Sequence, residues 1–229
     1  MKKKDVQKII KDTFSNYKEE PDQLSESYVA SIKSFSLPTE RMSKKTKSML
    51  LKDYESHVDA FNKISAMLDT SNRESSNSDY SGYRSLKIDE IYNMNSIYMT
   101  ELYLSNISDL TSEILMESLS FMKLERDFGT FENWQRDFIA CGMSARSGYV
   151  VTAFSTYLQR YVNFFTDSTN SNVPIGTYPT IVLRVDEISY DKDYANNKKA
   201  YIYNMMKELN WDIIEQRFNK SEKIAKSIR

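Results

Sequence analysis

The chain has 229 residues, of which 40% are hydrophobic and 28% are charged, and its formal net charge at pH 7 is −1. This composition is typical of a globular protein with enough apolar residues to form a core. The balanced charge argues against a dedicated nucleic-acid-binding protein, which usually carries a strong basic excess. The single cysteine, Cys141, excludes a disulfide bond within the chain.

The sequence also lacks the patterns of membrane and export segments. No apolar run approaches the length that spans a bilayer. The basic start, MKKKDVQKII, is not followed by the apolar core of a secretory signal peptide, and it lacks the arginine-rich, acid-poor character of a mitochondrial presequence. We therefore expect a protein that is not secreted and has no membrane contact.

The N-terminal part of the chain is predicted to be helical. Residues 2–18 carry an apolar stripe that consists of Val6, Ile9, Ile10, Phe14 and Tyr17. Residues 44–68 carry a second stripe that consists of Leu50, Leu51, Tyr54, Val58, Phe61 and Ile64. Pro38 prevents one helix from running through both. Residues 71–84, rich in Ser and Asn, are predicted as the loop of a helical hairpin, and residues 88–124, which lack Gly and Pro, as its second arm.

The C-terminal part combines helices with strands. A helix is predicted over residues 127–142, and β-branched and aromatic residues then predict strands over 149–155, 160–166 and 178–185. The acidic stretch DEISYDKDY, which begins at Asp186, is predicted as a solvated turn. The remaining predicted elements are helices over residues 191–207 and 210–218.

Together these elements predict an α+β fold, in which an N-terminal helical hairpin precedes a three-stranded antiparallel sheet packed with helices. The predicted segments, in chain order, are an N-terminal helical extension (1–35), a hairpin domain (36–127), an α+β domain (128–220) and a basic tail (221–229).

The order of motifs in the C-terminal part is similar to that of a known enzyme family. The segments FGTFENWQRDF (128–138), ARSGYVV (145–151), PTIVLRVDEISYDKDY (179–194) and NWDIIEQRF (210–218) resemble the C-terminal domain of iron/manganese superoxide dismutases. The resemblance continues more weakly over residues 36–127, where that family has a helical hairpin. It implies the superoxide-dismutase-like fold, with the N-terminal extension as an addition that the family lacks.

In that family a redox metal is held by three histidines and one aspartate, ligand types that suit iron or manganese. The resemblance places Arg184 at the position of the aspartate, and Thr100, Ile188 and either Met49 or Leu50 at the positions of the histidines. None of these side chains can replace the ligands, and the permanent charge of an arginine would repel a metal ion. The resemblance therefore implies a degenerate member with no metal, no cofactor and no catalytic residue.

The stretch LRVDEISY keeps two residues that the family uses at a two-fold interface, Glu187 and Tyr190. Because Ile188 has no ring N–H, the bridge that the family builds from the glutamate to a histidine of the partner is lost. Two interpretations stay open. Both residues are ordinary surface or turn residues, or they belong to a modified interface in which Asp186 or Glu187 pairs with Arg184. The candidate interface residues are Arg184, Asp186, Glu187 and Tyr190.

The leading hypothesis is a non-catalytic structural or interaction subunit of a larger assembly, either a phage virion component or a mitochondrial small ribosomal subunit protein. Its expected partners are proteins of that assembly, including a homo- or heterodimer partner at the dismutase-type interface. The basic residues near both ends of the chain are the expected place of any nucleic-acid contact. On this hypothesis the protein resides in a virion or a mitochondrion.

Two other functions stay open from the sequence. One is an enzyme or small-anion binder whose site is remodelled around Arg184, Asp186 and Glu187. The other is a nucleic-acid-binding module, which requires Lys and Arg residues clustered on one face. His57, the only histidine, is expected to be structural because one histidine makes no metal site. Cys141 is expected to be a small buried residue, since cysteine is among the most often buried residue types.

Overall fold

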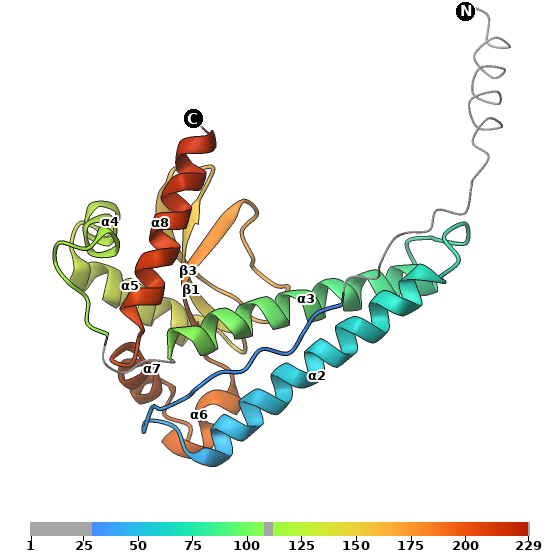
Figure 1. The fold of residues 1–229 in the computed structure, drawn as a ribbon, viewed down its shortest axis with the longest axis horizontal. Coiled ribbons are helices and arrows are strands. Elements are labelled where there is room, and N and C mark those ends of the chain that lie inside the picture. Colours follow the sequence, from blue (N-terminus) through green and yellow to red (C-terminus); the bar gives the residue numbers. More distant parts are fainter. Residues whose placement is uncertain (1–28, 108–111, 229) are drawn as a thin grey trace, which may run out of the picture.

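The structure, a computed structural model, describes residues 29–107 and 112–228; the predicted helix over residues 2–18 lies outside the described residues. The described chain begins with an extended strap, residues 29–39, which lies along two long helices, α2 (Lys44–Asp69) and α3 (Gly82–Asn106) (Figure 1). The backbone N–H of Ala30 donates to Oδ1 of Asn62 at 2.8 Å and so attaches the strap to α2.

The two helices form the predicted hairpin, with a loop at residues 70–81. Ser43 and Ser81 are their N-caps, and each side-chain oxygen accepts a hydrogen bond from the backbone N–H three residues later. Of the predicted stripe of α2, Leu50, Tyr54, Val58 and Phe61 are buried, whereas Leu51 and Ile64 are partly buried. The predicted hairpin is confirmed, but α3 begins at Gly82, within the stretch predicted as its loop.

The chain after α3 departs from the prediction. The single helix predicted over residues 88–124 is wrong, because α3 ends at Asn106 and α4 (Leu119–Phe128) begins only after the N-cap Ser118. Ser118 begins α4 without any Gly or Pro, because its side-chain oxygen accepts a hydrogen bond from the backbone N–H of Phe121.

A second correction concerns the start of the next helix. α5 spans Phe131–Ser144, and residues 127–128 belong to α4. Gly129, at φ 87°, turns the chain out of α4, a conformation that favours glycine. The side chain of Thr130 then caps α5.

The sheet agrees with the prediction. Its strands are β1 (Tyr149–Ser155), β2 (Arg160–Phe165) and β3 (Thr177–Arg184), all antiparallel in the order β2-β1-β3. The central strand β1 is buried along its whole length. In the register of β1 and β3, Tyr149 lies opposite Arg184, which places both residues at the end of the sheet nearest the hairpin.

Three helices follow the sheet, and each differs from the prediction. The acidic stretch predicted as a turn forms a helix, α6 (Glu187–Tyr194). The helix predicted over 191–207 is broken by Ala195, in the left-handed conformation, and α7 is shorter, Lys198–Met206. α8 (Trp211–Ile228) is twice the predicted length, so residues 221–228, predicted as a basic tail, are its last turns.

These elements pack into one core. α5 and α8 contact the sheet, α3 contacts β3, and α2 contacts α6 (Figure 1). Trp134 of α5 is fully buried, and its Nε1 donates to Oγ1 of Thr152 in the central strand at 2.9 Å. Seven helices and a three-stranded antiparallel sheet among the described residues make this an α+β fold. No helix in residues 29–107 or 112–228 has the length and apolar character needed to cross a bilayer.

Candidate functional site

The candidate site centres on Arg184, the last residue of β3, at the junction of the sheet and the hairpin. Its side chain is only 7% exposed. Nε and Nη2 donate to Oδ2 of Asp186 at 2.8 and 2.6 Å, and Nη1 donates to Oδ2 of Asp53 on α2 at 2.7 Å. Of the two acids proposed to pair with Arg184, Asp186 does so. Asp53 is a partner that the sequence did not indicate.

The guanidinium is held charged by these contacts. Burial by itself disfavours the charged form, but Tyr149, Asp186 and Asp53 together raise the pKa of Arg184 well above its ordinary value. The second oxygen of Asp186 accepts from the hydroxyl of Ser189 at 2.7 Å, so this carboxylate is engaged on both sides. One cation and two carboxylates therefore form a compact ion cluster with a formal charge of −1.

A buried tyrosine closes the cluster on the sheet side. The hydroxyl of Tyr149 lies 2.9 Å from Oγ1 of Thr100 on α3, and both residues are buried. Burial raises the pKa of Tyr149 to about 12, with Arg184 and Thr100 acting in the opposite direction, so the phenol is neutral at ordinary pH. Thr100, at a position where the family resemblance implies a ligand histidine, is thus committed to a hydrogen bond within the protein.

A pair of buried tyrosines lies next to the cluster. The hydroxyls of Tyr103 on α3 and Tyr201 on α7 are 3.1 Å apart, and Tyr201 donates to the backbone carbonyl of Arg184 at 2.8 Å. Both side chains are fully buried. Tyr103 also donates to Sδ of Met42 at 3.6 Å. These contacts fix the backbone at the end of β3 to helices on either side of it.

The other two positions implied as metal ligands are apolar. Leu50 is fully buried in the core, whereas the neighbouring Met49 is half-buried with its sulfur 3.0 Å from Nζ of Lys192. Of these two residues, Leu50 is therefore the one that faces the core. Ile188 on α6 is partly buried and packs against the core.

These residues do not fit an iron or manganese ion. Leu50, Thr100 and Ile188 offer no imidazole or carboxylate, and Arg184 brings a permanent positive charge. The two nearby carboxylates already neutralise that charge. In residues 29–107 and 112–228, no three His, Cys, Asp or Glu side chains come together in a way that could hold a metal ion.

The remaining residues singled out in the sequence lie around this cluster. Glu187 is exposed in the first turn of α6 and does not join Arg184 and Asp186 in one site. Tyr190 is buried, with its ring 5.9 Å from that of Tyr201. His57 is half-buried beside the cluster, with Nδ1 2.8 Å from Oδ1 of Asn93. His57 is thus partly buried, as expected.

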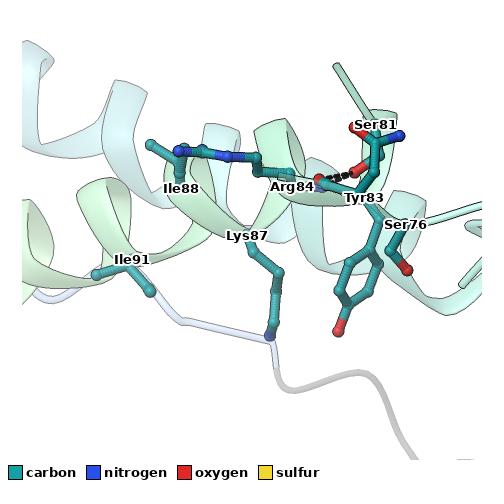
Figure 2. Close-up of a pocket in the computed structure, with 8 residues that line it drawn as sticks. Ser76, Ser81, Tyr83, Arg84, Lys87, Ile88 and Ile91 are labelled. Atoms are coloured by element: carbon teal, nitrogen blue, oxygen red, sulfur yellow. Dashed lines mark hydrogen bonds between the residues drawn. The ribbon is translucent and has the colours of Figure 1, made fainter. Parts of the chain in front are cut away.

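The cavity at the cluster is small. Its volume is about 80 Å³, and residues of α2, α3, the end of β3 and the loop before β1 line it. A hollow of about 400 Å³ lies elsewhere, at the tip of the hairpin, where Figure 2 shows Tyr83 and Lys87 projecting from the same side of α3. The cations there are engaged locally: Nε of Arg84 donates to the carbonyl of Ser78, and Lys87 pairs with Glu90 at 2.6 Å.

Sequence reasoning did not find Asp53, Tyr149 or Tyr201. Their residue types carry no motif, and their roles depend on contacts between elements distant in the chain. One signal was available for Asp53. It lies four residues after Met49 on a predicted helix, and therefore on a face next to the implied ligand position. An arginine buried at the end of a strand requires a counterion from such a face.

Comparison with known proteins identifies the family to which this chain is similar. The family "Iron/manganese superoxide dismutases, C-terminal domain" matches residues 117–217. The iron superoxide dismutase of Aquifex pyrophilus is 29% identical over 179 residues, which cover 77% of this chain and 83% of that protein. The iron superoxide dismutase of Aquifex aeolicus is 28% identical over 179 residues, which again cover 77% of this chain and 83% of that protein. That of Cupriavidus metallidurans is 31% identical over 135 residues, 58% of this chain and 66% of that protein. The chain therefore belongs to the iron/manganese superoxide dismutase family.

Proposed function

We propose that this chain is a non-catalytic member of its family that acts as a structural or interaction subunit of a larger assembly. The observation that supports this most is Arg184. It lies where the family resemblance implies the aspartate ligand, and it is bound to Asp53 and Asp186 at 2.6–2.8 Å. The ion cluster takes the place of the metal as the group that joins the hairpin to the sheet.

Superoxide dismutation requires a group that gains and loses one electron in turn. The side chains of arginine, threonine, leucine and isoleucine cannot gain and lose an electron in this way. The cationic guanidinium also disfavours binding of a redox metal ion that could. The relatives of this chain are named as iron or manganese superoxide dismutases. The proposal is that the fold is kept while the reaction is lost.

An exposed apolar group at the far end of the sheet supports an interaction role. Tyr157 and Leu158, in the turn between β1 and β2, are 89% and 55% exposed, and Ile175 is 98% exposed. The backbone N–H of Thr156 donates to the carbonyl of Gly176 at 2.9 Å, which brings the turn next to the loop that carries Ile175. Exposed apolar groups of this kind are typical of protein-binding surfaces.

A virion and a mitochondrial small ribosomal subunit remain the two proposed assemblies.

The loss of chemistry is tested by metal analysis and superoxide turnover. The protein is purified from cells supplied with iron and manganese, beside the Aquifex pyrophilus enzyme as a matched control. We expect far less than one metal ion per chain and no turnover above buffer, while the control shows both. One iron or manganese per chain together with superoxide turnover would overturn the proposal.

The interaction role is tested by the size of the native complex. We expect the chain in an extract of its source to elute in an assembly larger than a dimer. Changing Tyr157 and Ile175 to Asp should release it, whereas Met143→Asp on α5, a residue exposed to 44%, should not. Elution of the unmodified chain as a free monomer would contradict the role.

The small-anion alternative is less well supported. Nε, Nη1 and Nη2 of Arg184 each already donate to a carboxylate, so an anion would have to displace an acid that is tethered beside it. Calorimetric titration of the protein with phosphate or azide should therefore show no heat of binding. If a heat is seen and Arg184→Lys abolishes it, the small-anion alternative is supported.

A further inference from the structure

An apolar ridge runs along the solvent side of α3. Its residues are Ile88, Ile91, Met94 and Tyr98, and they are 47%, 46%, 48% and 44% exposed. Their spacing of three, three and four residues places them on one face of the helix. We call this set the α3 ridge. Four large apolar side chains half-exposed in one line form a surface that a partner segment would stabilise.

The α3 ridge borders a groove of about 710 Å³. Met94 and Tyr98 line one wall, and Ala30, Ser31 and Lys33 of the strap line the other. The strap is firmly held: Oδ1 of Asn62 accepts from Ala30, the hydroxyl of Tyr54 accepts from the backbone N–H of Lys33 at 3.1 Å, and Lys33 pairs with Glu101 at 2.5 Å. The groove is therefore a built feature of the surface.

The strap itself adds to the apolar surface. Val29 and Ile32 are 67% and 53% exposed. Val29 is the first described residue and precedes Ala30, which lines the groove, so residues 1–28 are covalently joined to the chain next to the groove. Residues 1–28 contain the stripe of Val6, Ile9, Ile10, Phe14 and Tyr17, which needs an apolar surface to cover it.

We propose that the α3 ridge and its groove bind residues 2–18 of the same chain through this stripe. The dimensions agree. A helix of 17 residues is about 25 Å long, and the ridge from Ile88 to Tyr98 spans about 15 Å. The ten residues 19–28 reach at most about 33 Å when extended, which is enough to return the segment alongside the strap.

A tether of this length favours the same chain over a second copy. It holds the segment at an effective concentration in the millimolar range, far above that of a second molecule in ordinary solution. The hollow at the hairpin tip, which includes Ile88 and Ile91 with Arg84 and Lys87, continues the surface toward the loop (Figure 2). Arg84 and Lys87 of this hollow are already bonded within the hairpin. Binding of residues 2–18 should therefore depend on apolar contacts with the α3 ridge.

Cysteine cross-linking in the full chain tests the proposal. In a Cys141→Ser background, Ile10→Cys is combined with Met94→Cys, and the matched control combines Lys8→Cys with Met94→Cys. Lys8 is two residues from Ile10 but lies on the opposite, polar side of the predicted helix. A disulfide requires Cα atoms within about 7 Å. We expect the Ile10 pair to form an intrachain disulfide at least about tenfold faster than the control.

Equal rates for the two pairs would overturn the proposal, and so would a disulfide that joins two chains as the main product. A second measurement does not depend on disulfide geometry. Met94→Glu should release the segment and speed tryptic cleavage after Lys8 and Lys11 several-fold, whereas Met143→Glu should not. Met94 is half-exposed, so circular dichroism should show an unchanged fold. Unchanged cleavage of the Met94 variant would count against the docking.

Discussion

Nη1 of Arg184 donates to Oδ2 of Asp53 at 2.7 Å, a contact between residues 131 positions apart in the chain. It connects the end of β3 to the middle of α2. Because the same guanidinium binds Asp186 at the start of α6, one side chain links the hairpin, the sheet and the following helix. The stability of the junction should therefore depend strongly on Arg184.

Arg184→Met should lower the free energy of unfolding by about 3–5 kcal/mol, because it leaves two partly buried carboxylates without their cation. Arg184→Lys should recover only part of this loss, since an ammonium group cannot reproduce the fork of three donated bonds. Urea unfolding followed by circular dichroism measures both. A suitable control is Lys87→Met, because Lys87 is 45% exposed and pairs with the partly exposed Glu90 one helical turn away. Its cost should stay below about 1 kcal/mol.

A double-mutant cycle separates the ion pair from simple packing. Arg184→Met and Asp53→Asn should each destabilise the protein, and the double variant should lose about 1–3 kcal/mol less than the sum. A coupling energy near zero would show that Asp53 and Arg184 act independently.

The buried phenol of Tyr149 should make the stability of the protein sensitive to alkaline pH. Burial raises its pKa from the ordinary value of 10.0 to about 12, so the folded state holds the phenol proton more tightly than the unfolded state. This contribution to stability is fully present below pH 10 and is lost as the pH rises toward 12. Tyr149→Phe should reduce the number of protons released on unfolding in that window by about one.

Urea titrations at stepped pH values measure that number from the slope of stability against pH. At neutral pH the same substitution should cost about 1–2 kcal/mol, because Thr100 loses its buried partner. Tyr157→Phe is the matched control, since Tyr157 is 89% exposed, and it should change neither quantity.

Cys141 should react slowly with thiol reagents. Burial, with a further contribution from Asp137, raises the pKa of its thiol from 9.0 to about 11. The thiolate fraction at neutral pH is then about 100-fold lower than that of an unperturbed thiol. Labelling of the native protein with an aromatic disulfide reagent should be slower by about this factor than labelling in urea. A native rate equal to that of glutathione would contradict this account.

The end of α8 should be required for stability. The hydroxyls of Tyr161 and Ser221 are 2.6 Å apart, Lys123 pairs with Glu222 at 2.6 Å, and Ala225 is buried. Deletion of residues 221–229 should therefore cost about 2–4 kcal/mol. Deletion of residues 226–229 removes only exposed side chains among the described ones and should cost below about 0.5 kcal/mol. Thermal unfolding distinguishes the two.

The strands and the hairpin were predictable because each follows a strong local pattern. The stripe of α2 repeats with the helical period, and β1 to β3 are rich in β-branched and aromatic residues. The helix boundaries were not predictable from composition alone. Ser118 begins α4 as its N-cap, and Ala195 ends α6 in the left-handed backbone conformation. Neither position is occupied by Gly or Pro.

The candidate site was predictable only in part. The resemblance to the dismutases located Arg184, Thr100 and Ile188, and the charge of Arg184 required an acidic partner. The choice of Asp186 over Glu187 follows from the start of α6 at residue 187, which keeps Asp186 beside β3 and leaves Glu187 exposed. The contribution of Asp53 arises from the packing of α2 against the sheet end, which no local pattern encodes.

The ion cluster also limits which side chains this site can accept. Arg184→Asp alone would set a third carboxylate beside Asp53 and Asp186 with no cation among them. Introducing a single histidine at residue 50 would place a polar ring in a fully buried apolar site. Each of these two substitutions, made alone, should therefore lower the stability of the protein. A metal site with the ligands that the resemblance implies could be built here only by changing several residues together.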